Sequence, residues 1–180
     1  MRITGGEQRG RHIYGPHTRT VRPTMDRLRE SAFALLDRIP GGDFLDLFSG
    51  TGVVAAEAAS RGARLITVVE RRRANRPNLE RNLAFAAGRV TIRLQPCEAF
   101  LQGAKGEWRY IFMDPPFAYR FVGQLLQVVA TRRLLAADGV LLLHLPRQNS
   151  ETEAELGAIF RPIDRRVFGG SILHLLAWPE

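Results

Sequence analysis

Short apolar runs alternate with helix-like segments along most of this chain, and that alternation constrains the fold more than any other feature. Five runs have the length and composition of buried strands: FLDLF (44–48), LITVVE (65–70), VTIRL (90–94), RYIFMD (109–114) and VLLLHL (140–145). The segments around them are predicted to be helical: 24–39, 53–61, 71–87, 97–102 and 119–131. Strands that alternate with helices predict a doubly wound α/β fold with a mostly parallel sheet.

The C-terminal part of the chain departs from this alternation. After a predicted helix at about 151–159, two strand-like runs, RPIDRRVF and SILHLLAW, flank Gly169-Gly170. A Gly-Gly pair between such runs is typical of a β-hairpin, which would add antiparallel pairing at one edge of the sheet. The chain of 180 residues fits one domain, and no internal repeat or linker divides it.

The first 23 residues differ in composition from the rest. They are rich in glycine and show no clear apolar period, so 1–23 is predicted to be a basic arm, with room for a short hairpin, ahead of a globular domain at 24–180. One acidic residue, Glu7, opposes five arginines: Arg2, Arg9, Arg11, Arg19 and Arg22. A segment of this composition has little apolar surface to bury, and its charge favours contact with a polyanion.

The charge of the whole chain favours the same kind of partner. Lys+Arg number 26 against 18 for Asp+Glu, a net charge of +8, and Lys105 is the only lysine. A GC-rich genome accounts for the preference for arginine over lysine, but it does not account for the excess of positive charge. We therefore expect a nucleic acid partner.

Several protein classes are disfavoured by what the sequence lacks. No stretch has the roughly 18 consecutive apolar residues of a membrane span, and the opening MRITGGEQRGRH has no apolar run typical of a secretory signal. Cys97 is the only cysteine, which excludes an intramolecular disulfide and a cysteine-rich zinc site. We expect a cytoplasmic protein with no metal and no membrane association.

A glycine-rich turn, DLFSGTG, links the first predicted strand to the next helix. Gly50 and Gly52 let the backbone turn tightly and let a ligand approach it closely. In a doubly wound fold, nucleotide-like ligands bind at such turns. The spacing matches neither G-x-G-x-x-G nor a P-loop, so an adenosyl ligand without a pyrophosphate is favoured over a dinucleotide.

Glu70 ends the second predicted strand, 24 positions after Asp46. An acidic residue about 20 positions beyond a glycine turn can accept hydrogen bonds from ribose hydroxyls. Taken alone, Glu70 is equally compatible with the exposed start of a helix. Its place after DLFSGTG favours the ribose role.

The tetrapeptide DPPF, at residues 114–117, follows the strand RYIFM directly. Prolines fix the backbone and lack N–H donors, so the loop presents carbonyl oxygens beside the Asp114 carboxylate. Rigid acceptors at the carboxyl end of a strand suit an amino group, and Phe117 offers a flat face on which a base can stack. In isolation, the tetrapeptide is also compatible with a proline-rich turn and a core phenylalanine.

In their order, these motifs resemble the RsmD-like 16S rRNA guanine-N2 methyltransferases, which modify guanine 966 of that RNA. The resemblance covers almost the whole chain: RITGGEQRGRHI, RPTMDRLRESAF, DLFSGTGVVAAEAASRGA, VVE, DPPF and FGGSILHLL. DPPF is shared with many amino-methylating enzymes, whereas GG-x-x-RGR-x-I and RPT-x-x-R-x-RE are more specific and carry the resemblance to this family. The resemblance implies a Rossmann-like class I methyltransferase domain with a seven-stranded sheet. It also implies S-adenosylmethionine as cofactor, and ribosomal RNA or a small-subunit ribosomal particle as partner.

The resemblance also implies roles for individual residues. The methionine end of the cofactor would be held by residues of the glycine turn: Asp46, Ser49, Gly50 and Gly52. Glu70 would hold its ribose. The target base would be held and oriented by the DPPF loop: Asp114, Pro115, Pro116 and Phe117. Residues near the N-terminus would lie beside the RNA or the cofactor: Arg22, Thr24 and Arg27. The charge of the arm, and not the resemblance, predicts phosphate contacts for Arg9 and Arg11.

Two positions depart from the pattern of that family. An acidic residue commonly follows the third strand and meets the adenine; here the segment is LQPCEAF, which leaves Cys97 and Glu98 as alternatives. The strand VLLLHL carries His144 where a glutamate is expected near its end. A half-buried structural histidine is the favoured interpretation of that residue.

The expected reaction needs no metal, because a sulfonium methyl group is already activated. Asp114 and a Pro115 or Pro116 carbonyl would accept hydrogen bonds from the amino group and aim its nitrogen at the methyl. The same loop chemistry also serves adenine N6 in RNA or DNA, so DPPF does not identify the base. A protein-glutamine methyltransferase would not need the basic arm, and a non-catalytic RNA-binding protein would need neither DLFSGTG nor DPPF.

Overall fold

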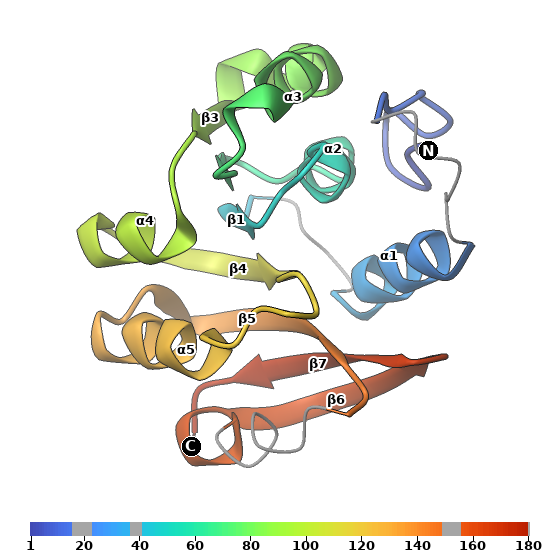
Figure 1. Ribbon diagram of the computed structural model, residues 1–180. Helices are drawn as coiled ribbons and strands as arrows, with labels where there is room; N and C mark the ends of the chain where they lie inside the picture. The colour runs from blue at the N-terminus through green and yellow to red at the C-terminus, as the bar shows by residue number, and fades with distance from the viewer. Residues whose placement is uncertain (16–22, 37–40, 149–155, 180) are drawn as a thin grey trace.

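A seven-stranded sheet forms the centre of the computed structural model, which describes residues 1–15, 23–36, 41–148 and 156–179 (Figure 1). Its strands are β1 (Phe44–Leu47), β2 (Ile66–Val69), β3 (Val90–Arg93), β4 (Trp108–Met113), β5 (Leu135–Pro146), β6 (Arg161–Phe168) and β7 (Ser171–Ala177). The strand order is β3-β2-β1-β4-β5-β7-β6, with parallel pairing from β3 to β5. β7 pairs antiparallel with both β5 and β6. The predicted doubly wound sheet with a C-terminal antiparallel hairpin is confirmed.

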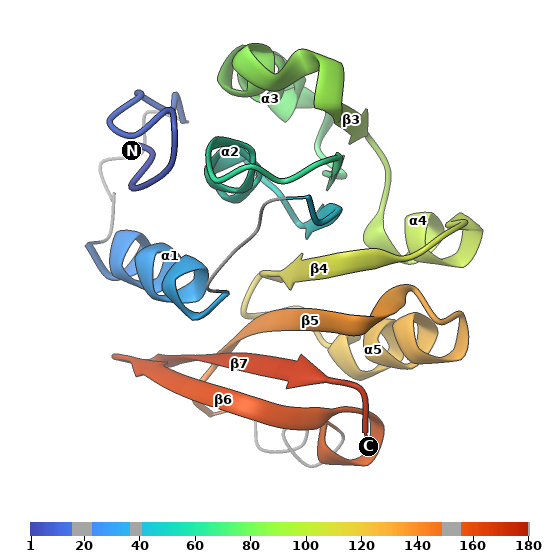
Figure 2. The same cartoon turned by 180° about the vertical axis from the view of Figure 1, so that it is seen from behind.

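Helices cover both faces of the sheet (Figures 1 and 2). They are α1 (Pro23–Leu35), α2 (Val53–Ser60), α3 (Arg76–Leu83), α4 (Cys97–Gly103) and α5 (Val122–Thr131). Successive strand residues supply two separate apolar cores: Phe44 packs with residues of α1, α2 and α3, and Leu45 with residues of α4 and α5. Such burial on both faces explains why the strands are apolar at nearly every position.

The sequence predicts that no segment crosses a membrane, and the helices of the structure bear on that prediction. Among the residues that the structure describes, no helix combines the length and apolarity that crossing a bilayer requires.

The predicted helix over 71–87 is divided in the structure. The short 3-10 helices η1 (Arg73–Asn75) and η2 (Ala84–Arg89) flank α3. Pro77 lies in the first turn of α3, where its missing N–H is not needed and its fixed φ favours a helix start. The fifth strand is also longer than the predicted 140–145, because β5 begins at Leu135 and pairs there with Trp108.

The N-terminal segment, residues 1–15, forms the short hairpin that the sequence allowed. It packs against the core beside α1, α2 and α3. Arg2 and His12 form an antiparallel bridge, and Ile3 and Ile13 are each 1% exposed. The expectation of little buried apolar surface was therefore wrong for these two side chains. The division of the chain at residue 23 stays a prediction.

Glu57 of α2 anchors this N-terminal segment. Its side chain is fully buried and accepts hydrogen bonds from the backbone N–H groups of Thr4 and Gly5, both at 2.8 Å. Arg29 of α1 and Arg61 pair with the same carboxylate at 3.2 and 2.9 Å. One buried charge thus joins the segment, α1 and α2, and its removal would leave the buried Arg29 with Asp26 as its remaining acidic partner.

Candidate active site

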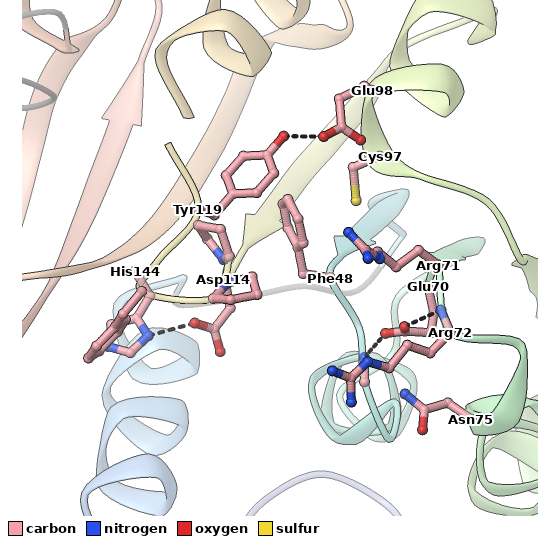
Figure 3. Close-up of a pocket in the computed structure, with 14 residues that line it drawn as sticks. Phe48, Glu70, Arg71, Arg72, Asn75, Cys97, Glu98, Asp114, Tyr119 and His144 are labelled. Atoms are coloured by element: carbon pink, nitrogen blue, oxygen red, sulfur yellow. Dashed lines mark hydrogen bonds and ion pairs between the residues drawn. The ribbon is translucent and has the colours of Figure 1, made fainter. Parts of the chain in front are cut away.

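A pocket of about 660 Å³ lies at the carboxyl edge of the parallel strands (Figure 3). Its walls come from the loops after β1, β2 and β4, from the start of α4 and from β5. Figure 3 shows Glu70, Arg71 and Arg72 on one side and Asp114 with His144 on the other. The topology explains the position, because parallel strands deliver their ends to one edge.

The glycine turn forms one wall of the pocket. Gly50 has φ of 57°, and a Cβ built there would meet nothing within 4 Å, so its backbone borders open space. Its N–H donates to Glu70 Oε2 at 2.8 Å, while the N–H of Arg72 donates to Glu70 Oε1 at 2.6 Å. Phe48 lines the same wall with φ of 61°, a strained conformation for a bulky residue. The Glu70 carboxylate therefore links the loops that follow β1 and β2 and holds the glycine turn in one conformation.

Asp46 lies beneath this wall and is 1% exposed. Its Oδ2 accepts hydrogen bonds from the Ser49 hydroxyl at 2.5 Å and from the Ala55 N–H at 3.2 Å. Burial raises the pKa of Asp46 to about 7, and the charges of Asp114 and Glu70 add to that effect, although both hydrogen bonds oppose it. A cationic ligand nearby would favour the ionised form.

The start of α4 closes the pocket on a third side with both candidates for the adenine contact. The Cys97 thiol is buried, and burial raises its pKa to about 12. Glu98 is exposed, and its Oε1 accepts a 2.5 Å hydrogen bond from the Tyr119 hydroxyl. Burial, with the bond to Glu98 and its charge, raises the pKa of Tyr119, so the hydroxyl stays a donor. Both alternatives left by the sequence thus line the pocket.

The DPPF loop forms the opposite wall. Asp114 Oδ1 lies 2.8 Å from Nδ1 of His144, and the Asp114 side chain is 28% exposed. Pro115 is buried, whereas Pro116 is exposed and its carbonyl accepts a hydrogen bond from the Tyr119 N–H at 2.7 Å. Phe117 is 53% exposed, so its ring is available at the mouth of the pocket.

The structure brings six of the nine residues predicted for catalysis and cofactor binding into the lining: Gly50, Glu70, Asp114, Pro115, Pro116 and Phe117. Asp46 and Ser49 are buried supports of the turn. Gly52 is the N-cap of α2, and a Cβ there would lie 2.9 Å from Leu79 of α3, so close helix packing explains this glycine.

The predicted RNA-contacting residues lie elsewhere. Arg9 and Arg11 are exposed on the N-terminal segment, and Arg27 is exposed on α1. Thr24 lies in the first turn of α1, but its side chain is outside the described residues, as is all of Arg22. Arg11 contacts Gln8 at 3.1 Å and lies over the Phe85 ring at 4.8 Å.

Sequence reasoning missed several residues that line the pocket: Phe48, Arg71, Arg72, Asn75 and Tyr119. Phe48 lies within DLFSGTG, and Arg71, Arg72 and Asn75 follow Glu70, so proximity to those motifs was a usable signal. Tyr119 had none, since its contact with Glu98 joins two elements 21 positions apart. His144 was noticed but interpreted as structural; it is 3% exposed and contacts Asp114 directly.

A model of the family described as conserved hypothetical protein 95 matches residues 1–177. The chain belongs to this family. Ribosomal RNA small subunit methyltransferase D of Escherichia coli K12 is 32% identical over 151 residues, which cover 83% of this chain and 76% of that protein. YlbH of Bacillus subtilis is 30% identical over 155 residues, covering 82% and 84% of the two chains. The resemblance to RsmD-like enzymes is confirmed.

The family fold is equally well matched. The solved structure of yhhF from Escherichia coli superposes with a TM-score of 0.87 at 28% identity, covering 100% of this chain and 99% of that one. Among the described residues of this family member, no group of three or more histidine, cysteine or acidic side chains is arranged to hold a metal ion.

Proposed function

We infer that this protein uses S-adenosylmethionine to methylate the exocyclic N2 amine of a guanine in 16S rRNA. The observation that carries the proposal is the convergence of Gly50 and Glu70 with Asp114 and Phe117 in one pocket. A ribosomal RNA methyltransferase is 32% identical to the chain, which supports the reaction class and the substrate class. Such a substrate would place the protein in the cytoplasm.

The pocket wall of the glycine turn fits S-adenosylmethionine. The open space over Gly50 can admit a ligand that packs against the protein backbone. Asp46 beneath the turn supplies a buried carboxylate suited to a cationic group. Each Glu70 oxygen accepts one backbone N–H and retains a lone pair for a ribose hydroxyl. Glu98 is the better adenine partner of the two alternatives. The Cys97 thiol stays protonated, whereas the Oε2 atom of Glu98 is open to a hydrogen-bond donor. The bound cofactor would supply the activated methyl group.

The DPPF wall fits an exocyclic amino group. The Pro116 carbonyl already accepts the Tyr119 N–H, so the Pro115 carbonyl and Asp114 Oδ2 are the acceptors best placed to bind the amine. The nitrogen lone pair of guanine N2 is delocalised into the ring, so two acceptors would aim it and stabilise the positive charge that builds there. Phe117 can stack on a base that has left its helix, which offsets roughly 1–3 kcal/mol of lost stacking.

One basic surface borders the pocket on its cofactor side, and a second, on the N-terminal segment, lies next to the glycine turn. Arg71, Arg72 and Arg73 are exposed, and none forms an ion pair with a described residue. The N-terminal segment lies alongside, because Asn82 donates both to the Tyr14 carbonyl and to the Thr51 carbonyl of the glycine turn. Unpaired arginines around a pocket that takes a base are suited to phosphate contacts.

Methyl transfer is the direct test of the proposal. The protein and tritiated S-adenosylmethionine would be incubated with naked 16S rRNA, small ribosomal subunits, and unmodified DNA, and the modified nucleotide would be mapped. We expect label at guanine N2 in ribosomal RNA. Label at adenine N6 would show that adenine, and not guanine, is the target base. Binding of S-adenosylmethionine without transfer to any of these acceptors would contradict the proposal.

The contribution of the N-terminal segment to RNA binding can be measured from salt dependence. We expect Arg9→Ala with Arg11→Ala to lower RNA affinity and to flatten the log–log salt slope by roughly one to two units. Binding with fewer phosphate contacts releases fewer counterions. Lys105→Ala with Arg109→Ala removes equal charge near the start of β4, outside the pocket lining, and serves as the control. Superimposable lines for the Arg9/Arg11 variant and the wild type would assign the contact to Arg71, Arg72 and Arg73 instead.

A further inference from the structure

His144 is the buried side chain in the pocket that the proposed chemistry has not used. It is 3% exposed, and its Nε2 has no hydrogen-bond partner among the described residues. Its Nδ1 lies 2.8 Å from Asp114 Oδ1, and its ring packs edge-on against Phe117 with centroids 5.8 Å apart. One imidazole thus contacts both side chains that the proposed function assigns to the target base.

The position of the imidazole is fixed by the sheet. Met113, the last residue of β4, is in register with Leu143 of β5, so Asp114, which follows β4 directly, lies beside His144 of β5. On its other side His144 is in register with Leu173 of β7. Pairing with β7 fixes the backbone at His144, and burial leaves the ring little freedom, which makes it a rigid support for a carboxylate at the end of a strand.

We propose that His144 is a positioning residue for Asp114: its Nδ1–H donates to Asp114 Oδ1 and so turns Oδ2 toward the amino group of the target base. A carboxylate accepts and cannot donate, so an ionised Asp114 selects the tautomer with the proton on Nδ1. The buried Nε2 is then an unprotonated nitrogen, which costs less without a partner than a buried N–H or a second charge. The inference rests on the proposed function for its consequence but not for the contact itself.

The contact can be tested without methyl transfer, by nitrogen-15 NMR of histidine-labelled protein. We expect the His144 ring to be protonated at Nδ1 alone, with its signals identified by their loss in His144→Asn. Asp114→Ala removes the acceptor, so protonation of Nε2 should then become detectable. A wild-type ring protonated at Nε2, or a ring unchanged by Asp114→Ala, would overturn the proposal.

The consequence can be tested with two substitutions of different chemistry. His144→Leu fills the space without a donor, whereas His144→Asn places an amide N–H near the position of Nδ1. We expect His144→Leu to lower kcat by roughly 10- to 100-fold, as misplacing a reacting group does. KM for RNA and Kd for S-adenosylmethionine should stay within about twofold, and His144→Asn should recover most of the loss. Equal impairment of both variants, or normal kcat in His144→Leu, would contradict a positioning role.

A double-mutant cycle separates positioning from general damage. If His144 acts through Asp114, adding His144→Leu to Asp114→Ala should cause no further loss of single-turnover rate, whereas independent effects would multiply. Thermal unfolding of each variant reports damage to the fold separately. If the wild type transferred no methyl group to any RNA, the proposed function would fail, while the NMR result would still decide the contact.

Discussion

The two walls of the pocket are held in different ways. On the glycine-turn wall, backbone N–H groups bind buried carboxylates: Gly50 and Arg72 donate to Glu70, and Ala55 donates to Asp46. On the DPPF wall, side chains are held by other side chains: Asp114 contacts His144, and Tyr119 donates to Glu98 at the start of α4. The first wall is buried, with Glu70 only 6% exposed, whereas Phe117 on the second is 53% exposed.

This difference suits the two ligands that we propose. A cofactor of constant shape can be bound by a preformed backbone turn, which costs little reorganisation. A base that must leave an RNA helix needs an open wall where it can arrive and stack. Substitutions in the two walls should therefore affect different steps, and the following experiments are designed to separate them.

The largest effect is expected from Asp114→Ala. This change removes one acceptor of the proposed amino-group contact, so the rate of methyl transfer should fall by on the order of 10²-fold or more. S-adenosylmethionine affinity, measured by calorimetry, should change little because the glycine-turn wall is intact. Near-normal turnover would remove DPPF from the mechanism, and a parallel loss of cofactor affinity would mean that the walls do not act separately.

Gly50→Val should have the converse effect. A branched side chain would enter the open space over the turn, and S-adenosylmethionine affinity should fall by at least roughly 10-fold. The left-handed backbone adds about 1–2 kcal/mol of strain. Gly106→Val is the matched control, because Gly106 also has a left-handed φ and open space around it but does not line the pocket. Equal affinity in the two folded variants would reject the glycine turn as the cofactor site.

The same difference explains what could be predicted from the sequence. A backbone turn needs glycine at fixed positions, so DLFSGTG, and Glu70 after it, were visible as a local pattern that the structure places at the pocket. The role of His144 depends on the register between β4 and β5, which no local pattern specifies. Likewise, Ile3 is buried because Glu57, more than fifty positions away, anchors its neighbours.

Asp46 gives a smaller effect that depends on pH. Burial raises its pKa in the folded state from 3.8 to about 7, so its favourable contribution to stability is fully present only below pH 3.8 and is lost progressively as pH rises from there through 7. Asp46→Asn does not titrate, so its stability relative to the wild type should increase by about 1.4 kcal/mol between pH 6 and pH 8. Urea unfolding at both pH values measures this, with Asp138→Asn as an exposed control. A constant difference between Asp46→Asn and wild type would contradict the burial of a titrating carboxylate.

The smallest effect is expected from Tyr119→Phe, which removes a hydrogen bond that joins the DPPF wall to the start of α4. The hydroxyl donates to Glu98, a partly solvated acceptor, so its loss should cost about 0.5–1 kcal/mol, or roughly two- to fivefold in S-adenosylmethionine affinity. Tyr119→Phe keeps the ring that packs edge-on against Phe48 and Phe121, so the DPPF loop should stay in place and kcat should remain within about threefold of wild type. Calorimetry and single-turnover rates would be compared with those of Phe121→Leu, which changes the same aromatic cluster without touching the hydrogen bond. A loss of kcat approaching that of Asp114→Ala would show that cofactor and base are held by one coupled unit, because a single bond between α4 and the DPPF wall would then govern the chemistry.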